Sequence, residues 1–368
     1  MRKRVLIVVP TLGIGGGEKL AIDIVLNLDV QKYEVLLLSL FPKMGTEFES
    51  IIKKNNINIQ FLNKKLGFDP KVIFAFANVV RKYKPHTIHT HLNVVPYVLP
   101  ATILYGIKNR FHTVHSVASR ESTGFLKKIM KITYRFFSFT PVAICDFVKT
   151  TICEEYDLPD EKVPCIYNGV NTEIFKKLER KQNANYINFI TTGRMQHVKN
   201  HNLMINAFSD VAKKYDNVML TILGDGELRL DIEKQIKELG LEEKVILKGI
   251  VSNVAEELNQ ADVYIMTSNY EGLPLSVLEA MASGLPIVTT KAGGVIDIVK
   301  QNQNGLLVDV GNREQLTKEM SKLVENVLLR QRFGEVSFNM SKQYDIQKCV
   351  KKYESLYLSS KDNRLCWY

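Results

Sequence analysis

Two basic side chains stand five positions apart just after a predicted strand in the second half of the chain. The strand is expected at residues 187–192, and Gly193 then lets the chain turn before Arg194 and Lys199. Two fixed cations beside the start of a helix suit a leaving diphosphate, on which negative charge grows as the bond to it breaks. Because basic residues near a helix start oppose the helix dipole, an anionic partner is expected, although a solvated loop would also accommodate both residues.

The most specific stretch, S-N-Y-E-G-L-P-L-S-V-L-E-A-M-A-S-G-L-P, occupies residues 268–286 and contains two carboxylates. Glu271 precedes a Gly-Leu-Pro turn, a helix is expected to begin near Leu275 or Ser276, and Glu279 lies one turn inside it. The N–H groups at such a helix start can bind phosphate, while carboxylates suit sugar and ribose hydroxyls. The plainer interpretation makes both acids ordinary helix charges, but the apolar neighbours of Glu279 predict burial.

A glycine-rich loop follows the first predicted strand. It reads T-L-G-I-G-G-G-E from Thr11 to Glu18 and leads into a helix expected from Glu18, which lets backbone N–H groups approach a phosphate. A dinucleotide fingerprint is not met, because Glu18 replaces the third glycine and the second strand closes with Ser39 and Leu40 instead of an acid. A tight turn is the alternative role of these glycines.

Histidines lie near the ends of two further predicted strands, in I-H-T-H-L and F-H-T-V-H-S. His89 and His91 share one face of a strand, but no carboxylate or cysteine stands at a spacing that would complete a metal site, so hydrogen-bonded structural histidines are expected. His115 closes its strand at the edge where ligands of such sheets lie, so a polar contact with a substrate is expected. The sequence contains no D-x-D, the paired acidic ligands of many magnesium or manganese sites, and no metal is predicted.

Length and composition limit the number of domains and the classes of protein to which the chain could belong. The 368 residues exceed the usual size of one hydrophobic core, which predicts two domains, and the 45% hydrophobic and 24% charged fractions predict globular folding throughout. The formal net charge of +10 favours the binding of polyanions, but the sequence contains no nucleic-acid-binding signature. Five cysteines without a C-x-x-C pair indicate a reducing compartment, and no apolar run has the length of a membrane-spanning helix, so a cytoplasmic protein is expected.

Short apolar runs alternate with helical segments along both halves of the chain. This alternation predicts an α/β protein with two doubly wound parallel sheets, one in residues 1–178 and one in residues 179–344, separated by a polar stretch near residue 178. Ligands of such sheets lie at the carboxyl ends of the strands. A cleft between two facing sheets would therefore hold one ligand from both sides.

Several motifs together resemble a known family: G-G-x-E after the first strand, I-Y-N-G-V-N at 166–171, G-R-x-x-x-x-K at 193–199, L-G-D-G-E-L at 223–228 and E-G-L-P-L-S-V-L-E-A-M-A-S-G-L-P-I-V at 271–288. In this order they resemble the family 4 retaining glycosyltransferases of the GT-B fold, in which two Rossmann-like domains face each other across a cleft. The resemblance implies an acceptor-binding domain over residues 1–178 and a nucleotide-sugar-binding domain over residues 179–344. It also implies a last helix, about 345–368, that packs back on the first domain.

The resemblance implies roles for individual residues. Arg194 and Lys199 would bind the diphosphate, Glu279 the ribose and Glu271 the donor sugar, with His115 near that sugar. No metal cofactor would be needed. Further donor contacts would come from glycines, turns and a helix start: Gly16, Gly17, Gly193, Ile250, Gly272, Leu273, Leu275 and Ser276.

The function implied is transfer of a sugar from a nucleotide diphosphate sugar, with uridine as the favoured base, to a saccharide or polyprenyl-linked acceptor in bacterial surface polysaccharide, lipopolysaccharide or capsule synthesis. No motif places a nucleophilic carboxylate, so a front-face route through a short-lived ion pair is the working hypothesis for retention. Asn171 and the stretch A-I-C-D at 143–146 depart from the family pattern and leave the acceptor undetermined. The alternatives are a nucleotide-sugar epimerase or hydrolase on the same fold, an NAD-dependent oxidoreductase, and a non-catalytic lectin-like protein.

A basic and aromatic stretch, G-F-L-K-K-I-M-K-I-T-Y-R-F-F-S, occupies residues 124–138. One interpretation is an amphipathic helix that turns Lys127, Lys128, Lys131 and Arg135 toward anionic lipid. The other is a domain helix with a solvated basic face. The first interpretation would place the protein at the inner face of the cell membrane, where a lipid-linked acceptor would lie.

Overall fold

The chain forms two compact units, each with its own parallel sheet. The computed structural model describes residues 2–178 and 186–358. The first unit contains the described residues up to Gly169 together with the last helix, and the second runs from Val170 to Asp345.

The division between the units falls before residues 170–178, which the sequence pattern had grouped with the first half. These residues associate with the second unit because the Val170 N–H donates to the carbonyl oxygen of Tyr344 at 2.8 Å. Most of the polar stretch predicted near the junction, residues 179–185, lies outside the described residues.

A sheet of six parallel strands forms the centre of the first unit, in the order β3-β2-β1-β4-β5-β6. The apolar run Val5–Val9 is fully buried in the central strand, because a strand with helices on both faces has no solvent-facing side. The predicted parallel sheet is confirmed. The strands are β1 (Lys3–Val9), β2 (Tyr33–Ser39), β3 (Ile59–Phe61), β4 (Thr87–His91), β5 (Asn109–Val114) and β6 (Thr140–Ala143).

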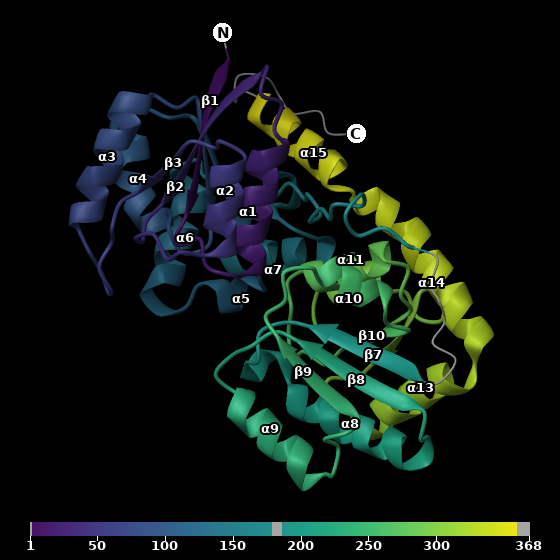
Figure 1. Cartoon of the computed structure of the whole chain (residues 1–368). Coiled ribbons are helices and arrows are strands. Elements are labelled where there is room, and N and C mark those ends of the chain that lie inside the picture. Colours follow the sequence, from purple (N-terminus) through teal and green to yellow (C-terminus); the bar gives the residue numbers. More distant parts are fainter. Residues whose placement is uncertain (1, 179–185, 359–368) are drawn as a thin grey trace. The chain divides into compact units, whose positions relative to one another are not determined.

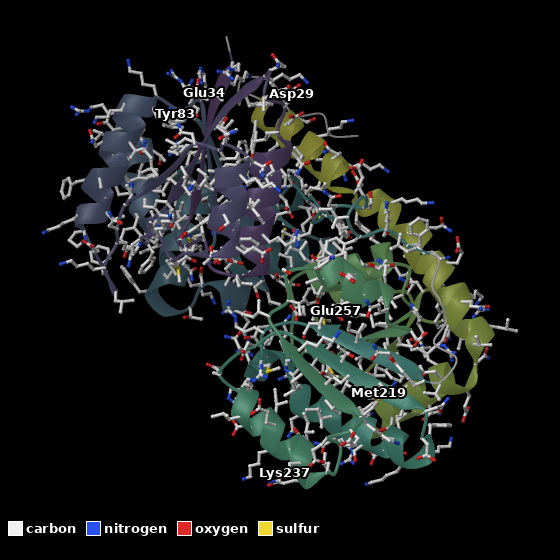
Figure 2. The ribbon with its side chains drawn as sticks, viewed as in Figure 1. Asp29, Glu34, Tyr83, Met219, Lys237 and Glu257 are labelled. Carbon is white, nitrogen blue, oxygen red and sulfur yellow. The ribbon has the colours of Figure 1, made fainter. Side chains whose placement is uncertain are left out.

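Helices cover both faces of this sheet: α1 (Gly16–Asn27), α2 (Glu47–Lys54), α3 (Lys71–Tyr83), α4 (Val95–Leu104), α5 (Ala118–Glu121), α6 (Gly124–Phe136), α7 (Asp146–Tyr156) and the short 3-10 helix η1 (Asp160–Lys162). The chain crosses from β1 to β3 in one direction and from β3 to β6 in the other, so right-handed crossovers put α1 and α2 on one face and α3, α4 and α6 on the other. Helix α3 packs on α4 and α4 on α6 (Figure 1). The Tyr83 hydroxyl donates to the carbonyl oxygen of Glu34 at 2.7 Å and ties α3 to β2 (Figure 2).

The last described helix, α15 (Ile346–Leu358), belongs to the first unit and packs beside α1 (Figure 1). Glu354 accepts the backbone N–H of Asp29 at 2.9 Å. On the inner side, Tyr353 and Tyr357 are fully buried over the sheet. A segment from the far end of the sequence thereby completes the core of the first unit.

The second unit repeats the same architecture, with its strands in the order β12-β11-β10-β7-β8-β9. The strands are β7 (Ile187–Thr192), β8 (Val218–Leu223), β9 (Val245–Gly249), β10 (Val263–Met266), β11 (Ile287–Thr290) and β12 (Gly305–Val308). The helices are η2 (His197–Lys199), α8 (His201–Lys214), α9 (Arg229–Glu238), α10 (Val254–Asn259), α11 (Leu275–Ala282), α12 (Val295–Ile298), α13 (Arg313–Glu325), α14 (Val327–Ser341) and η3 (Lys342–Tyr344).

One large apolar cluster holds the second unit together. Phe189 of β7 meets Phe208 of α8 edge to face, with ring centroids 6.4 Å apart. Such contacts fix α8 against the strand that leads into the Arg194 loop. Among the helices of residues 2–178 and 186–358, none is both long and apolar enough to cross a membrane.

Candidate active site

The second unit has a topological switch point between β7 and β10. The two strands are neighbours, but from β7 the sheet continues through β8 to β9, and from β10 it continues through β11 to β12. The connections that leave their carboxyl ends therefore run in opposite directions, and such a switch point is the usual ligand position in these sheets. The loop after β7 carries Arg194 and Lys199, and the loop after β10 carries Glu271.

Lys199 and Glu271 form an ion pair across this switch point. The ammonium nitrogen lies 2.6 Å from Oε1 of Glu271, which also accepts a hydrogen bond from the Ser268 hydroxyl at 2.6 Å. Burial by itself lowers the pKa of Lys199, but the charge and hydrogen bond of Glu271 outweigh it, so the pKa lies above its ordinary value. The ammonium is therefore held charged in a fixed place, with Glu271 as its partner.

Tyr264, which none of the sequence motifs indicated, lies close enough to Lys199 to affect its pKa. Tyr264 of β10 is fully buried, and its hydroxyl lies 3.4 Å from the carbonyl oxygen of Thr192, the last residue of β7. Burial raises its pKa, although hydrogen bonds to Ser276 and Thr192 oppose this. The polar hydroxyl within an otherwise apolar strand, V-Y-I-M, was the available signal.

The loop that carries Arg194 is clamped by its neighbour after β8. The Met195 N–H donates to the carbonyl oxygen of Asp225 at 3.0 Å, and the Leu228 N–H donates to the carbonyl oxygen of Met195 at 3.1 Å. Gly224 has φ +129°, and a Cβ there would lie 2.1 Å from the Gly193 carbonyl oxygen. The L-G-D-G-E-L motif therefore needs its glycine for close packing against the Arg194 loop, whose arginine side chain is exposed.

Helix α11 begins at the same edge of the sheet. Its first backbone N–H groups, those of Leu275 and Ser276, precede the helical hydrogen-bond ladder and follow Pro274. Glu279, one turn later, is only 8% exposed, as its apolar neighbours predict. The helix thus brings backbone donors and a buried carboxylate to one side of the switch point.

The remaining predicted positions of the second unit also lie on loops at this edge. Gly272 and Leu273 are buried between Glu271 and α11. Ile250 follows β9 and is exposed, while the preceding Gly249 accepts the Gly224 N–H at 2.7 Å. Strand order thereby gathers the predicted residues of the second half along one edge.

The first unit has its own switch point between β1 and β4. The glycine loop after β1 leads directly into α1, which begins at Gly16, two residues before the predicted start at Glu18. Gly16 is exposed, whereas a Cβ on Gly17 would lie 3.0 Å from the Leu92 side chain just after β4. The Thr11 hydroxyl donates to Glu18 at 3.2 Å and closes the loop.

His115 lies at the end of β5, and its Nε2 is 2.9 Å from Nδ1 of His91. Burial lowers the pKa of His115 to about 4, against the opposing charge of Glu121. Glu121 accepts the backbone N–H groups of His115 at 2.6 Å and Ser116 at 2.8 Å. His115 is therefore a neutral imidazole in a tightly held turn.

His89 is a structural histidine, as predicted. Its Nδ1 lies 2.6 Å from the Tyr357 hydroxyl and its Nε2 lies 2.8 Å from the Thr113 hydroxyl. Both ring nitrogens are thus engaged with protein groups, one of them from α15. Throughout the described parts of the chain, no group of three or more His, Cys, Asp or Glu side chains could hold a metal ion.

Two family models match the chain. The model described as Glycosyltransferase Family 4 matches residues 14–174, and the model described as Glycosyl transferases group 1 matches residues 170–340.

Curated proteins and solved structures agree with these matches. The Escherichia coli UDP-Gal:alpha-D-GlcNAc-diphosphoundecaprenol alpha-1,3-galactosyltransferase is 25% identical over 82% of this chain and 82% of its own length. The Campylobacter jejuni N-acetylgalactosamine-N,N'-diacetylbacillosaminyl-diphospho-undecaprenol 4-alpha-N-acetylgalactosaminyltransferase is 24% identical over 93% of this chain and 95% of its own. The structure of Anabaena Alr3699/HepE with UDP and glucose superposes with a TM-score of 0.84 at 19% identity, covering 97% of this chain and 100% of that one. The chain belongs to glycosyltransferase family 4 and has the GT-B fold.

Proposed function

We propose that this glycosyltransferase transfers a sugar from a UDP-linked donor, with retention of configuration and without a bound metal, to a saccharide or polyprenyl-linked acceptor of a bacterial surface glycan. The observation that carries the proposal is the β7–β10 switch point, where Lys199, Glu271, Glu279 and the start of α11 meet at one sheet edge. Fixed cations and backbone donors suit a diphosphate, and carboxylates suit the hydroxyls of ribose and sugar.

In this proposal Lys199 and Arg194 stabilise the charge that develops on the leaving diphosphate. Lys199 is already oriented by Glu271 at 2.6 Å, so its charge needs little rearrangement during the reaction. Glu279 binds the ribose, and Glu271 also contacts the donor sugar. In the first unit, the neutral imidazole of His115 is the proposed hydrogen-bonding group for a sugar or acceptor hydroxyl.

The relatives support the donor and acceptor classes. A UDP-sugar is named for the E. coli relative, and UDP with glucose is bound by Alr3699/HepE. Both enzymes with undecaprenol in their names also specify an α linkage, which is the retained configuration when the nucleotide sugar is itself α-linked. A polyprenyl diphosphate saccharide is accordingly the proposed acceptor class.

Metal independence is proposed because the sequence contains no D-x-D and the basic side chains can supply the charge that a divalent ion would provide. Turnover should persist in excess EDTA. Loss of turnover in EDTA, restored by added magnesium or manganese, would overturn this part of the proposal.

The role of Arg194 is tested with Arg194→Ala. Loss of a group that stabilises developing charge should lower kcat by about 10²–10³ while UDP affinity changes less. Arg313→Ala is the matched control, because Arg313 is an exposed arginine of α13 that pairs with Asp210 in the same unit. Unchanged kcat in Arg194→Ala would contradict the assignment.

Donor and reaction type are tested together by incubating the protein with a panel of nucleotide sugars and no acceptor. Slow release of one unaltered sugar and its nucleotide would identify the donor of a transferase. Release of an altered sugar would instead favour an epimerase on the same fold.

A further inference from the structure

The helical layer formed by α3, α4 and α6 has an unusual charge composition. Between residues 70 and 145 the sequence contains one carboxylate, Glu121, whose side chain is 7% exposed and binds backbone N–H groups. The same stretch contains many basic residues, most of them exposed: Lys71, Arg81, Lys82, Lys84, Lys108, Arg110, Arg120, Lys127, Lys128, Lys131 and Arg135. This stretch therefore presents positive charge to the solvent with no exposed carboxylate of its own.

The basic residues predicted to face lipid divide into two groups. Lys127 pairs with Glu155 of α7, and Lys131 and Arg135 pair with Asp157 at the end of α7. These three residues thus tie α6 to its neighbour. Lys128 points elsewhere, since it lies on the exposed side of α6.

Large apolar side chains surround Lys128 on that exposed side. Phe125 is 77% exposed, Ile132 49% and Phe136 72%. Their spacing along the helix, with Lys128 between the first two, places all four on one face. The buried residues of α6, on the opposite face, are Met130, Thr133 and Tyr134. We call Phe125, Lys128, Ile132 and Phe136 the α6 face.

The elements beside α6 also expose large apolar side chains. Helix α4, which packs on α6, ends with exposed Ile103 and Leu104. Helix α3, which packs on α4, exposes Phe74, and the loop before it exposes Leu66 and Phe68. All three helices cover the same face of the sheet, so the exposed apolar residues belong to one layer (Figure 1).

We propose that the α6 face is the centre of a membrane-docking surface that binds bilayers containing anionic lipid. Exposed aromatic and aliphatic side chains among basic residues suit insertion at the level of the headgroups, with the basic groups near the lipid phosphates. No carboxylate is exposed across residues 70–145, and the exposed Asp157 beside α6 is paired with both Lys131 and Arg135. This surface therefore keeps an excess of positive charge, which complements a negatively charged bilayer.

The position of α6 also suggests what docking would accomplish. The helix begins three residues after Glu121, which holds the His115 turn at the carboxyl edge of the sheet. An acceptor anchored in the bilayer would thereby be gathered near that edge. This use of the surface rests on the proposed function, whereas the binding of anionic membrane does not.

The test measures co-sedimentation of the full chain with vesicles of phosphatidylcholine and with vesicles in which part of it is replaced by phosphatidylglycerol. The full chain should bind the anionic vesicles preferentially. Lys128→Glu should weaken this binding by about fivefold or more, since each basic group near an anionic surface contributes about that factor. The double variant Phe125→Ser, Phe136→Ser should weaken it similarly, because two aromatic side chains no longer insert.

Matched controls come from α9 in the second unit. Leu230 is 77% exposed, like Phe125, and Lys237 is an exposed lysine labelled in Figure 2. Leu230→Ser and Lys237→Glu should leave vesicle binding unchanged. Equal binding of the full chain to both vesicle types, or an equal loss in Lys237→Glu and Lys128→Glu, would overturn the proposal.

Two further readouts separate docking from catalysis. Donor hydrolysis without vesicles should be unchanged in the α6 variants, since they change only exposed side chains away from the switch points, and thermal unfolding should confirm their folding. The vesicle assay contains neither donor nor acceptor, so failure of the docking proposal and failure of the transferase proposal give different results.

Discussion

Removing one member of the Lys199–Glu271 pair should destabilise the protein almost as much as removing both. Their charged atoms lie 2.6 Å apart, and the side chains are only 22% and 14% exposed. At an effective dielectric constant of about 20, unit charges about 4 Å apart attract by about 4 kcal/mol. Part of this attraction offsets the lost hydration of both groups. Lys199→Met and Glu271→Gln should therefore each lower the free energy of unfolding by about 2–3 kcal/mol.

A double-mutant cycle isolates the interaction. The double variant should cost less than the sum of the two single variants, by about 2 kcal/mol, when urea unfolding is followed by circular dichroism at neutral pH. Lys291 and Asp309 provide a matched control, because their charged atoms lie 2.7 Å apart but their side chains are 49% and 62% exposed. Their coupling should be about 0.5 kcal/mol or less. Equal coupling in the two cycles would refute the argument from burial.

The affinity for UDP shows whether Lys199 also binds the diphosphate of the donor. Calorimetry should give a UDP affinity about tenfold or more lower in Lys199→Met, because a charge-assisted contact to the diphosphate is lost. Glu271→Gln should change UDP affinity less, since the ammonium remains. Equal losses in both variants would mean that the pair acts only as a structural unit.

Three further outcomes are expected. Gly224→Ala should lower the free energy of unfolding in urea by about 2–3 kcal/mol, because its Cβ would lie 2.1 Å from a carbonyl oxygen. Gly240→Ala should lower it by only about 1 kcal/mol, because Gly240 has φ +63° but no atom lies within 4 Å of a Cβ there. Tyr357→Phe should cost about 1–2 kcal/mol by leaving His89 Nδ1 without its 2.6 Å partner, and an unchanged unfolding midpoint would contradict this. Burial, with the charge of Lys199, lowers the pKa of His201 to about 4 in the folded protein. As the pH drops from 6.5 toward 4, His201 therefore becomes protonated in the unfolded chain but stays neutral in the folded protein, and the free energy of unfolding falls. His201→Gln should reduce this slope by up to about 1.4 kcal/mol per pH unit, measured by unfolding at several pH values.

Periodicity and local chemistry were sufficient to predict the secondary structure around the site. The run I-N-F-I-T-T predicted β7. The turn before L-S-V-L-E-A-M-A predicted a helix start near Leu275 or Ser276, and α11 begins at Leu275. The apolar neighbours of Glu279 predicted its burial. These features depend on residues within a few positions of one another, so the local sequence is sufficient to predict them.

The contacts that organise the site depend on which strands become neighbours. Lys199 and Glu271 are 72 positions apart and meet because β10 pairs with β7, and the spacing of charges along the chain does not encode that pairing. His89 and Tyr357 are 268 positions apart and meet because α15 returns to the first sheet. The sequence by itself determined the elements and the residue types at their ends. Only the tertiary structure decided their partners, because strand order and helix docking are set by the packing of the whole core.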